Sequence, residues 1–324
     1  MNGSNENARR WGQRTVSGLL MLGLILGFAL SASADSHQGG WKTTGWIGYE
    51  GQGETDLDVT DTQDPEFDFW DIGGGLKSQT MLGDSVSMSV GGDYRVVSYN
   101  FDGFGDFRDP WGTIHVFRFD PIFVYKMDEK WSLIGGPSLQ LSVEAGADVG
   151  DSLTGGGVAG VRYKWSETLS IALGLVVTSQ IEDSARFQPF ALITWGISDN
   201  LSFDVKARNS RGGEFRLSYA LGDNWKIGIG GGFRRERFRL DNSLGGSADP
   251  DQEFQRGKGG VGEEEAKVVN LSVAYAFSET LSLEGYGGVT VDGDFRLEDE
   301  YGKKIAKSDY DNSGYGGLRI NFGF

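Results

Sequence analysis

The sequence lacks cysteine and is poor in proline and histidine. Its 324 residues include no cysteine, six prolines and two histidines. The absence of cysteine excludes disulfides, thiolate metal sites and a lipidated N-terminal cysteine. No apolar stretch reaches the length of a membrane-spanning helix, and only one, near the start, comes close to it. The rest of the chain could therefore enter a membrane only as strands.

Basic residues are also scarce. The chain has 30 Lys and Arg against 46 Asp and Glu, a net charge of −16. Such an acidic chain does not bind nucleic acid or anionic lipid through its bulk charge. Its abundant residues are 52 Gly, 20 Phe, 11 Tyr and 9 Trp. An aromatic, glycine-rich composition with little proline is typical of β-structure.

The N-terminal residues have the three parts of a secretory signal peptide. Three arginines lie between residues 9 and 14, an apolar run covers residues 17–31, and Ala-Ser-Ala follows at 32–34. We therefore expect residues 1–34 to be cleaved and the mature chain, 35–324, to form one domain. The alternative, an uncleaved anchor, is disfavoured because the run is shorter than the roughly 20 residues of a span. Cleavage leaves 27 basic and 45 acidic residues, a net charge of −18.

The mature chain divides into segments in which apolar and polar residues alternate. Two kinds of connection join these segments. Six are short and place an acidic residue beside Ser, Thr, Asn, Gly or Lys, which is the chemistry of a tight turn. The short connections are residues 82–85, 127–130, 165–168, 197–200, 221–224 and 277–280. The other seven are mostly rich in Asp, Glu and Gly, and several are long. They are residues 54–66, 102–112, 145–153, 182–185, 209–213, 242–264 and 298–312.

Tight turns that alternate with longer loops are typical of an outer-membrane β-barrel, which has short periplasmic turns and extended outer loops. Six turns and seven loops require fourteen strands, with both ends of the mature chain on the periplasmic side. We therefore predict an all-β, antiparallel up-and-down transmembrane β-barrel of about fourteen strands. A twelve-stranded barrel is the second choice.

One face of nearly every predicted strand carries charged residues. In residues 201–208 and 214–221, for example, apolar side chains alternate with charged or small polar ones. In a membrane barrel the apolar face meets lipid and the charged face meets the lumen. The residues predicted to line the lumen are Lys77, Asp93, Arg95, Arg118, Asp120, Arg162, Asp204, Lys206, Arg216, Glu284 and Arg319.

A soluble β-sandwich or secreted barrel would show the same alternation with the apolar face turned inward. Periodicity alone does not separate inside from outside. Trp131, Trp165, Trp195 and Trp225 all lie beside predicted tight turns. One aromatic girdle of a membrane barrel is expected there, so these positions favour the transmembrane arrangement.

The last strand alternates strictly and finishes on an aromatic residue. Its apolar residues are Leu318, Ile320, Phe322 and Phe324. This ending resembles the closing strands of bacterial outer-membrane barrels. From that resemblance we expect the four residues to serve as an assembly signal for the barrel assembly machinery.

Residues 259–324 as a whole resemble an uncharacterised proteobacterial family of outer-membrane β-barrels. The resemblance is carried by the GGVGEEE approach, the GDFRLEDEYGKKI loop and the SDYD run before the last strand. It implies a barrel in the outer membrane of a Gram-negative bacterium, surrounded by lipid and lipopolysaccharide. It assigns no activity, cofactor or catalytic residue.

We do not expect an enzyme. Barrel hydrolases mostly use a histidine near a serine or a carboxylate. Only His37 and His115 are available; His37 precedes the first strand, and His115 shares the outward face of Phe117. The sequence therefore assigns no catalytic, cofactor or metal site.

Charged residues in the long connections suggest surface binding instead. Acidic clusters such as Glu263–Glu265 could hold divalent cations or share those of lipopolysaccharide, although solvated loops are the preferred interpretation. Arg234, Arg237 and Arg239 lead into the longest loop. We predict that they contact lipopolysaccharide phosphates or pair with neighbouring acidic loops. A change of parity there suggests a β-bulge near residues 230–232.

The predicted function is a narrow pore or passive transporter for small polar or cationic solutes. Fourteen strands lie between small barrels filled by side chains and the barrels of sixteen or more strands that leave an aqueous channel. The alternative is a non-conducting structural or surface-binding barrel whose inward charges close on each other as salt bridges. Lipopolysaccharide or divalent cations at the acidic loops would then be its ligands.

The acidic loop at 54–66 allows a first test. Changing Asp56, Asp58, Asp61 and Asp64 to Asn should reduce the preference of a conducting barrel for cations, because acidic side chains concentrate cations at the mouth. The reversal potential under a KCl gradient measures this preference. An unchanged reversal potential would show that these residues do not set the preference for cations.

Overall fold

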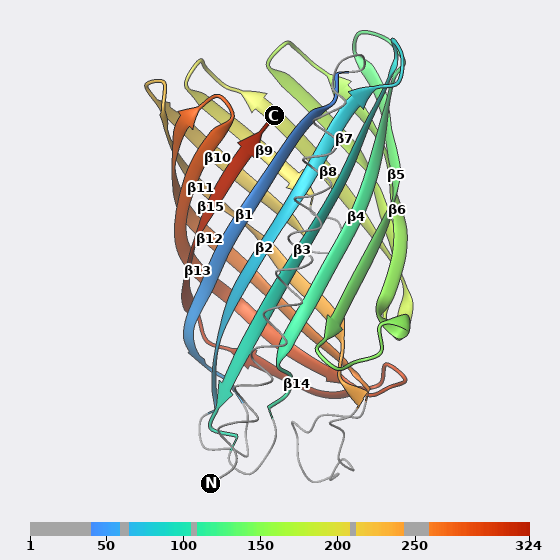
Figure 1. Ribbon diagram of the computed structural model, residues 1–324, viewed down its shortest axis with the longest axis vertical. Helices are drawn as coiled ribbons and strands as arrows, with labels where there is room; N and C mark the ends of the chain where they lie inside the picture. The colour runs from blue at the N-terminus through green and yellow to red at the C-terminus, as the bar shows by residue number, and fades with distance from the viewer. Residues whose placement is uncertain (1–39, 59–64, 105–108, 208–211, 243–258) are drawn as a thin grey trace.

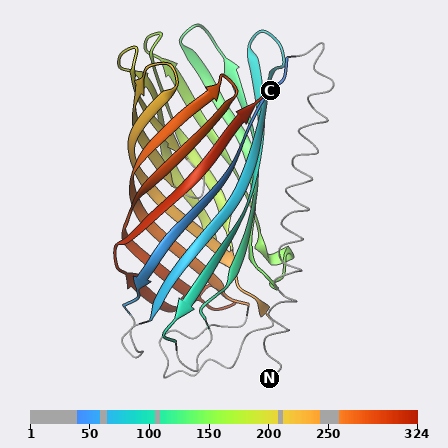
Figure 2. The same ribbon diagram turned by 60° about the vertical axis from the view of Figure 1, so that its left-hand side comes forward.

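The computed structural model describes residues 40–58, 65–104, 109–207, 212–242 and 259–324. The expected signal peptide lies outside the described residues. Fourteen antiparallel strands form a closed barrel (Figure 1 and Figure 2), and a short additional strand, β14, pairs along β13. The prediction of an all-β barrel with fourteen strands is confirmed.

Each barrel strand pairs with its neighbour in the chain. The first strands are β1 (Lys42–Asp56), β2 (Glu66–Met81), β3 (Val86–Asp102), β4 (Thr113–Lys126) and β5 (Trp131–Glu144). A 3-10 turn, η1 (Gly150–Ser152), precedes β6 (Leu153–Lys164), β7 (Leu169–Gln180), β8 (Asp183–Gly196), β9 (Leu201–Ala207) and β10 (Gly213–Leu221). The last strands are β11 (Trp225–Arg239), β12 (Val261–Ser278), β13 (Leu281–Glu298), β14 (Lys304–Tyr310) and β15 (Ser313–Gly323).

Pairing between the first and last strands closes the barrel. β15 lies between β13 and β1, and its register with β1 runs from Thr44 opposite Gly323 to Gln52 opposite Tyr315. The start of β1 and the end of β15 therefore lie at the same end as the six tight turns, the top in Figure 1. We call this the tight-turn end and the opposite one the loop end.

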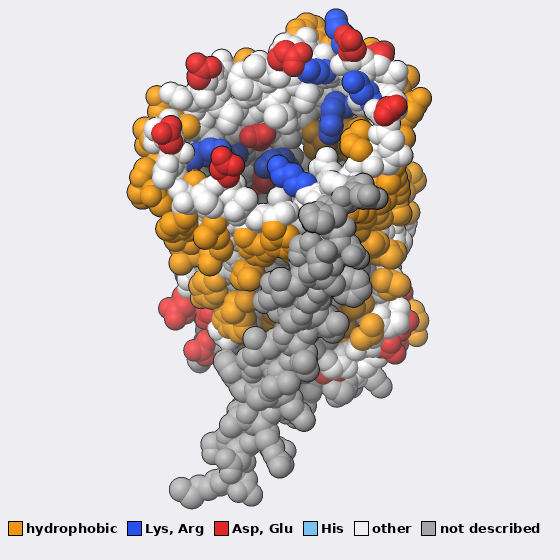
Figure 3. Space-filling model, turned by 45° about the horizontal axis from the view of Figure 1, so that its top comes forward, with side chains coloured by type: hydrophobic (Ala, Val, Ile, Leu, Met, Phe, Trp, Pro, Cys, Tyr) orange, Lys and Arg blue, Asp and Glu red, His pale blue; other side chains and the backbone are white. Residues whose placement is uncertain are grey.

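The outward face of the barrel is apolar. Leu173, Phe187 and Leu271 are 61%, 69% and 65% exposed, and Figure 3 shows a band of hydrophobic side chains around the wall. The four girdle tryptophans are also exposed beside their turns, and the outward direction of Leu318 and Ile320 is as predicted. In the part of the chain that is described, no helix is long and apolar enough to cross a membrane.

The tight turns hold their shape through local hydrogen bonds. In the turn between β4 and β5, the amide groups of Trp131 and Lys130 both donate to the Asp128 carboxylate at 2.7 Å. These bonds, that of Trp131 first, lower the pKa of Asp128. In the turn between β10 and β11, Gly222 has φ +66°, a left-handed conformation that disfavours residues with a Cβ.

At the loop end, part of the sheet leaves the wall and crosses the mouth. Arg239 at the end of β11 pairs with Val143 of β5, although five strands separate β11 from β5 along the wall. On the other side, Tyr310 at the end of β14 forms a bridge with Leu57 beyond β1. We call this bridging part the inner sheet; it consists of residues 234–239, 261–266, 292–298 and 304–310. Figure 1 shows β14 across the bottom of the barrel.

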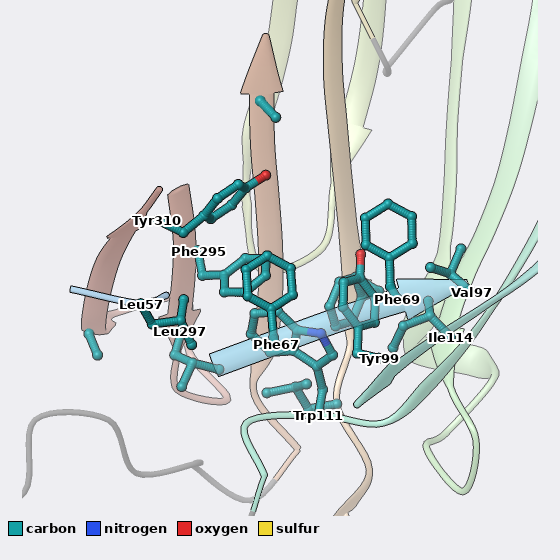
Figure 4. Packing of buried hydrophobic residues seen from close by; sticks show 14 of the residues in the cluster. Leu57, Phe67, Phe69, Val97, Tyr99, Trp111, Ile114, Phe295, Leu297 and Tyr310 are labelled. Carbon is teal, nitrogen blue, oxygen red and sulfur yellow. The ribbon is translucent and has the colours of Figure 1, made fainter. Parts of the chain in front are cut away.

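A hydrophobic core fills the space between the inner sheet and the wall formed by β2, β3 and β4. We call its rings the aromatic cluster: Phe67, Tyr99, Phe101, Trp111, Phe238, Phe295 and Tyr310. The ring centroids of Phe67 and Trp111 lie 4.6 and 4.8 Å from that of Phe295, which is fully buried (Figure 4). Most soluble proteins have such a core, but here it closes one end of a barrel.

Two sequence predictions about this end are wrong. Residues 298–312 are not only a loop, because they contain β14. No bulge interrupts β11, because its register with β10 and β12 runs without a shift through Gly230–Gly232. Phe233 and Phe238 simply lie on opposite faces of one regular strand, and the second is covered because the strand has bent into the barrel.

The aromatic cluster should carry much of the stability of the loop end. Replacing Phe295 with Ala should lower the free energy of unfolding by about 3–5 kcal/mol, because it leaves a cavity among packed rings. Urea unfolding of the refolded barrel, followed by tryptophan fluorescence, measures this. The matched control is Tyr301→Ala in the exposed turn between β13 and β14, which should change the value by less than about 0.5 kcal/mol. Equal effects of the two changes would contradict the role of the cluster.

Candidate functional site

The barrel contains a chamber of about 620 Å³ between the aromatic cluster and the tight-turn end. Its walls are formed by β1–β4, β9–β13 and β15, with Phe69 and Tyr99 at the boundary toward the loop end. Figure 3 looks into the tight-turn end and shows a hollow with Lys, Arg, Asp and Glu side chains inside it. The chamber therefore opens toward this end.

The structure places nine of the eleven residues predicted to line the lumen on the wall of this chamber. They are Lys77, Asp93, Arg95, Arg118, Asp120, Lys206, Arg216, Glu284 and Arg319. Arg162 on β6 and Asp204 on β9 are not part of the wall. Whether the nine line a conducting path stays a prediction.

Ion pairs concentrate in the half of the chamber next to the inner sheet. The Glu236 carboxylate on β11 accepts a hydrogen bond from Arg118 at 3.3 Å and lies 3.7 Å from the Arg95 guanidinium, which also pairs with Asp71. Gln140 and Ser142 of β5 donate to the same carboxylate at 3.2 and 3.1 Å. This network links the inner sheet to β2, β3, β4 and β5.

A second group joins the inner sheet to the strands that close the barrel. The Arg234 guanidinium donates to Glu50 of β1 at 2.5 Å and lies over the rings of Phe69 and Tyr315. The Tyr286 hydroxyl donates to the other oxygen of Glu50 at 3.0 Å. Because both partners of each contact are largely buried, these interactions are screened little by solvent.

Within the described residues, the buried Glu264 forms no ion pair, but two hydroxyl groups solvate its charge. Tyr99 and Tyr310 donate to its two oxygens at 2.5 and 3.1 Å. Both tyrosines belong to the aromatic cluster, so this carboxylate ties the cluster to β12.

The other half of the chamber, toward the tight-turn end, has a different character. Arg216 pairs with Glu284. Lys77, Lys206 and Arg319 also face the chamber, and none of the three takes part in an ion pair found in the described parts of the chain. The guanidinium carbon of Arg319 lies 4.9 Å from the ring centroid of Trp46, a cation–π contact.

The surface location predicted for Arg234, Arg237 and Arg239 is wrong, because their side chains are largely buried. The alternative prediction, pairing with neighbouring acidic connections, agrees with the contacts of the last two. Arg234 faces the chamber, as described above. Arg237 donates to the carbonyl of Ile181 at 2.8 and 3.1 Å and to Glu298 at 2.5 Å, and Arg239 pairs with Glu182. The physical reason is the bend of β11: the face of Arg237 and Arg239, which would meet the exterior in a straight strand, is pressed against the turn between β7 and β8.

The other candidates for a catalytic or metal site are His115 and the acidic connections. The His115 ring lies on the outward side of β4, where its Nδ1 shares a hydrogen bond of 2.7 Å with the hydroxyl of Tyr94. Within the described ranges, no group of three or more His, Cys, Asp or Glu residues is arranged to hold a metal ion. Asp61 and Asp64 of the first acidic loop lie outside the described residues.

Several important residues escaped the sequence analysis. Trp46 and Glu50 lie on the inward face of β1, and Glu236 and Glu264 lie on the inner sheet. Strict alternation could have found Trp46 and Glu50, because they share the parity of Gly48 on the chamber wall. Glu236 and Glu264 also have the inward parity of their strands, shared with Arg234 and Asn270, but the expected change of parity on β11 and the connection predicted at 242–264 concealed it.

Comparisons with known proteins find only distant similarity. No protein-family model matches the sequence, and a search of curated proteins finds no match. Among solved structures, an outer membrane channel from Pseudomonas putida F1 is similar at 12% identity and a TM-score of 0.43, over 87% of this chain and 95% of that one. A FadL homologue from Pseudomonas aeruginosa is similar at 11% identity and a TM-score of 0.47, over 87% and 89%.

A third structure is the translocator domain of the autotransporter NalP from Neisseria meningitidis, at 11% identity and a TM-score of 0.34, over 96% of this chain and 98% of that one. At identities and TM-scores this low, none of the three similarities assigns a function to this chain.

The contacts of Arg237 should hold the inner sheet in the mouth. In a chain without other cysteines, Cys in place of the fully buried Val116 should react slowly with a maleimide. Changing Arg237 to Ala should accelerate the reaction at least about tenfold, because breaking a buried pair costs several kcal/mol and tenfold corresponds to about 1.4 kcal/mol. The rate is followed by mass spectrometry.

Two controls accompany this experiment. Arg186→Ala removes a weaker pair, 3.9 Å from Glu265 and more exposed, and should leave the rate unchanged. Cys in place of Ser166, exposed in a tight turn, should react at once in every background. An unchanged rate at position 116 in the Arg237 variant would show that the arginine does not secure the inner sheet.

Proposed function

We propose that this chain is an outer-membrane barrel for the passive transport of small polar solutes, and that its described conformation is the closed one. The observation that carries the proposal is the chamber. It is lined by charges, occupies the barrel interior from the tight-turn end, and stops at the aromatic cluster. We propose no enzymatic activity for it.

The size of the chamber supports transport rather than a purely structural role. Its volume of about 620 Å³ lies within the roughly 300–1,000 Å³ typical of sites for small molecules. In a barrel that serves only as a scaffold, we expect side chains to fill the lumen throughout, as they do in small barrels. Here they fill it only at the loop end.

A route to the outside requires the inner sheet to move. Its attachment to the turn between β7 and β8 is polar, through Arg237 and Arg239, whereas its attachment to β1–β4 combines ion pairs of Glu236 and Arg234 with the aromatic cluster. Exchange of ion pairs with water costs less than exposure of packed aromatic rings. The inner sheet should therefore separate first from the turn between β7 and β8, and the smaller polar pocket there, lined by Arg118, Arg235 and Arg237, lies along that seam.

The location follows from the same architecture. The apolar outward band and the girdle of tryptophans beside the tight turns fit the outer membrane of a Gram-negative bacterium, with the tight turns on the periplasmic side. Export by the N-terminal signal peptide, assembly through the C-terminal strand and contact with lipopolysaccharide belong to the proposal.

A second candidate function is a permanently closed structural barrel. The fully buried aromatic cluster favours it, because such a core is costly to open. The two candidates differ in whether the barrel ever conducts.

A disulfide across the mouth distinguishes the candidates. Arg239 and Val143 are partners in adjacent, parallel strand positions, and neighbouring strands lie about 4.8 Å apart, within the Cα separation that a disulfide spans. Residues 35–324 with Val143→Cys and Arg239→Cys, refolded into a planar bilayer, should show no openings when oxidised and should conduct after reduction. The unmodified barrel should show brief openings from a closed baseline.

The matched control is Ser202→Cys with Ser218→Cys, partners on β9 and β10 that do not cross the mouth. It should conduct equally in both redox states. Openings that persist in the oxidised mouth variant, with the disulfide verified by mass, would show that the inner sheet is not the gate. A correctly folded barrel that never conducts would favour the structural role.

A further inference from the structure

We propose that the half of the chamber nearest the tight-turn end binds small organic carboxylates, with Arg319 as the principal contact. The proposal deepens the proposed function and rests on it in one respect, because it takes the bound anion to be the transported solute. The binding itself requires only the chamber.

The balance of charge along the chamber is the first step. Next to the inner sheet, Arg95, Arg118 and Arg234 are neutralised by Asp71, Glu236 and Glu50. Toward the tight-turn end, the cations Lys77, Lys206 and Arg319 have no ion-pair partner in the described ranges. The same wall also carries the carboxylates of Asp93, Asp120 and Glu214, so the accessible half is distinguished not by its net charge but by three cations whose donors are not held in ion pairs among the described residues.

Arg319 is the best placed of these cations to recognise a carboxylate. Its guanidinium lies 4.9 Å from the ring centroid of Trp46, and its Nε is buried with no acceptor in reach among the described residues. Stacking on an indole fixes the plane of a guanidinium while it leaves the edge free. That edge carries the donors that match the two oxygens of a carboxylate.

Glycine in the wall makes room for this arrangement. Gly75 lies opposite Trp46, and a Cβ on Gly75 would stand 2.7 Å from the indole Nε1. Gly48 lies opposite both Arg319 and Gly73, so the wall beside the guanidinium carries no side chain at these two positions. The indole can therefore lie close to the wall, and the Arg95 side chain covers Gly73 beside it.

Lys77 provides a second positive charge on the path to Arg319. It lies opposite Thr44, two residues from Trp46 toward the tight-turn end, whereas Arg319 lies opposite Gly48, two residues in the other direction. An anion that enters from the tight-turn end passes Lys77 first and meets Arg319 beyond Trp46. Two cations on either side of an aromatic ring favour a carboxylate attached to an apolar body.

Asp93 weakens the attraction of an anion to Lys77 and so helps to decide which cation is the principal contact. It faces the chamber from β3, opposite Gly75, and its Oδ2 is buried without a hydrogen-bond partner in the described part of the chain. Its negative charge lies one strand from Lys77 and weakens any anion site there. Arg319 lies across β1 from this charge, and its own cross-strand neighbour, Glu284, is paired with Arg216, so we assign the contact to Arg319 rather than to Lys77.

The test uses refolded residues 35–324 in detergent micelles and three probes of similar size: benzoate, benzamide and benzylammonium. Isothermal titration calorimetry should detect binding of benzoate and at least about tenfold weaker binding of the other two. Arg319→Gln should weaken benzoate binding about tenfold or more, and Arg319→Lys should weaken it less. Asp93→Asn should strengthen it. Lys303→Gln, which removes a positive charge in the exposed turn between β13 and β14, is the matched control and should have no effect.

Equal binding of benzoate and benzamide, equal binding by the Arg319→Gln variant, or no benzoate binding by the folded protein would each overturn the proposal. Heat-modifiable migration on a gel verifies that each variant is folded. Because calorimetry does not depend on an open path, benzoate binding by a barrel that never conducts would support the site and contradict transport. Conduction without benzoate binding would support transport and contradict the site.

Discussion

The bend of the sheet across its own mouth is the constraint on which the interior of this protein depends. A closed barrel satisfies its backbone hydrogen bonds around the wall, and this requirement holds for any strand that crosses a membrane. At the loop end, β11, β12 and β13 continue their pairing beyond the wall and carry it into the mouth, where β14 extends it. The backbone thus remains hydrogen-bonded while much of the inner sheet becomes buried, although Lys304, Lys307 and Asp309 of β14 stay exposed. One face packs on the aromatic cluster, and the other makes ion pairs with the opposite wall.

This bend also explains why the interior has two unlike halves. A fourteen-stranded wall encloses more space than inward side chains fill, particularly where those positions are glycine, as at Gly48, Gly73 and Gly75. The inner sheet fills the space at the loop end and brings its own carboxylates, Glu236 and Glu264, to the inward cations and hydroxyls. Beyond the reach of the inner sheet, the same wall retains an open chamber and cations without such partners.

The barrel and most of its chamber wall could be predicted from sequence because both depend on period-two alternation, which is a local property. Alternation places Lys77 and Arg319 correctly without knowledge of what lies opposite them. It could not predict that Arg234 meets Glu50, because the two are 184 positions apart and the contact needs the closed barrel and the bend together. The same limit explains the error at Arg237 and Arg239. Their parity marks the outward face of β11, but a strand that leaves the wall no longer has an exterior there.

The charged groups available to a solute inside the chamber therefore differ from those that it meets at the acidic connections. The net charge of the chain reflects its acidic connections. Their electric field acts at the mouth and is screened over about 8 Å at physiological ionic strength. A solute inside the chamber lies within contact distance of individual side chains, where pairing decides which charges remain available. At the loop end the carboxylates of the inner sheet neutralise the inward arginines. At the tight-turn end no inner sheet is present to do so, and Arg319 beside Trp46 is left available to an anion. The net charge of the sequence thus predicts the selectivity of the loops, while the selectivity of the chamber depends on how far the inner sheet extends into the barrel.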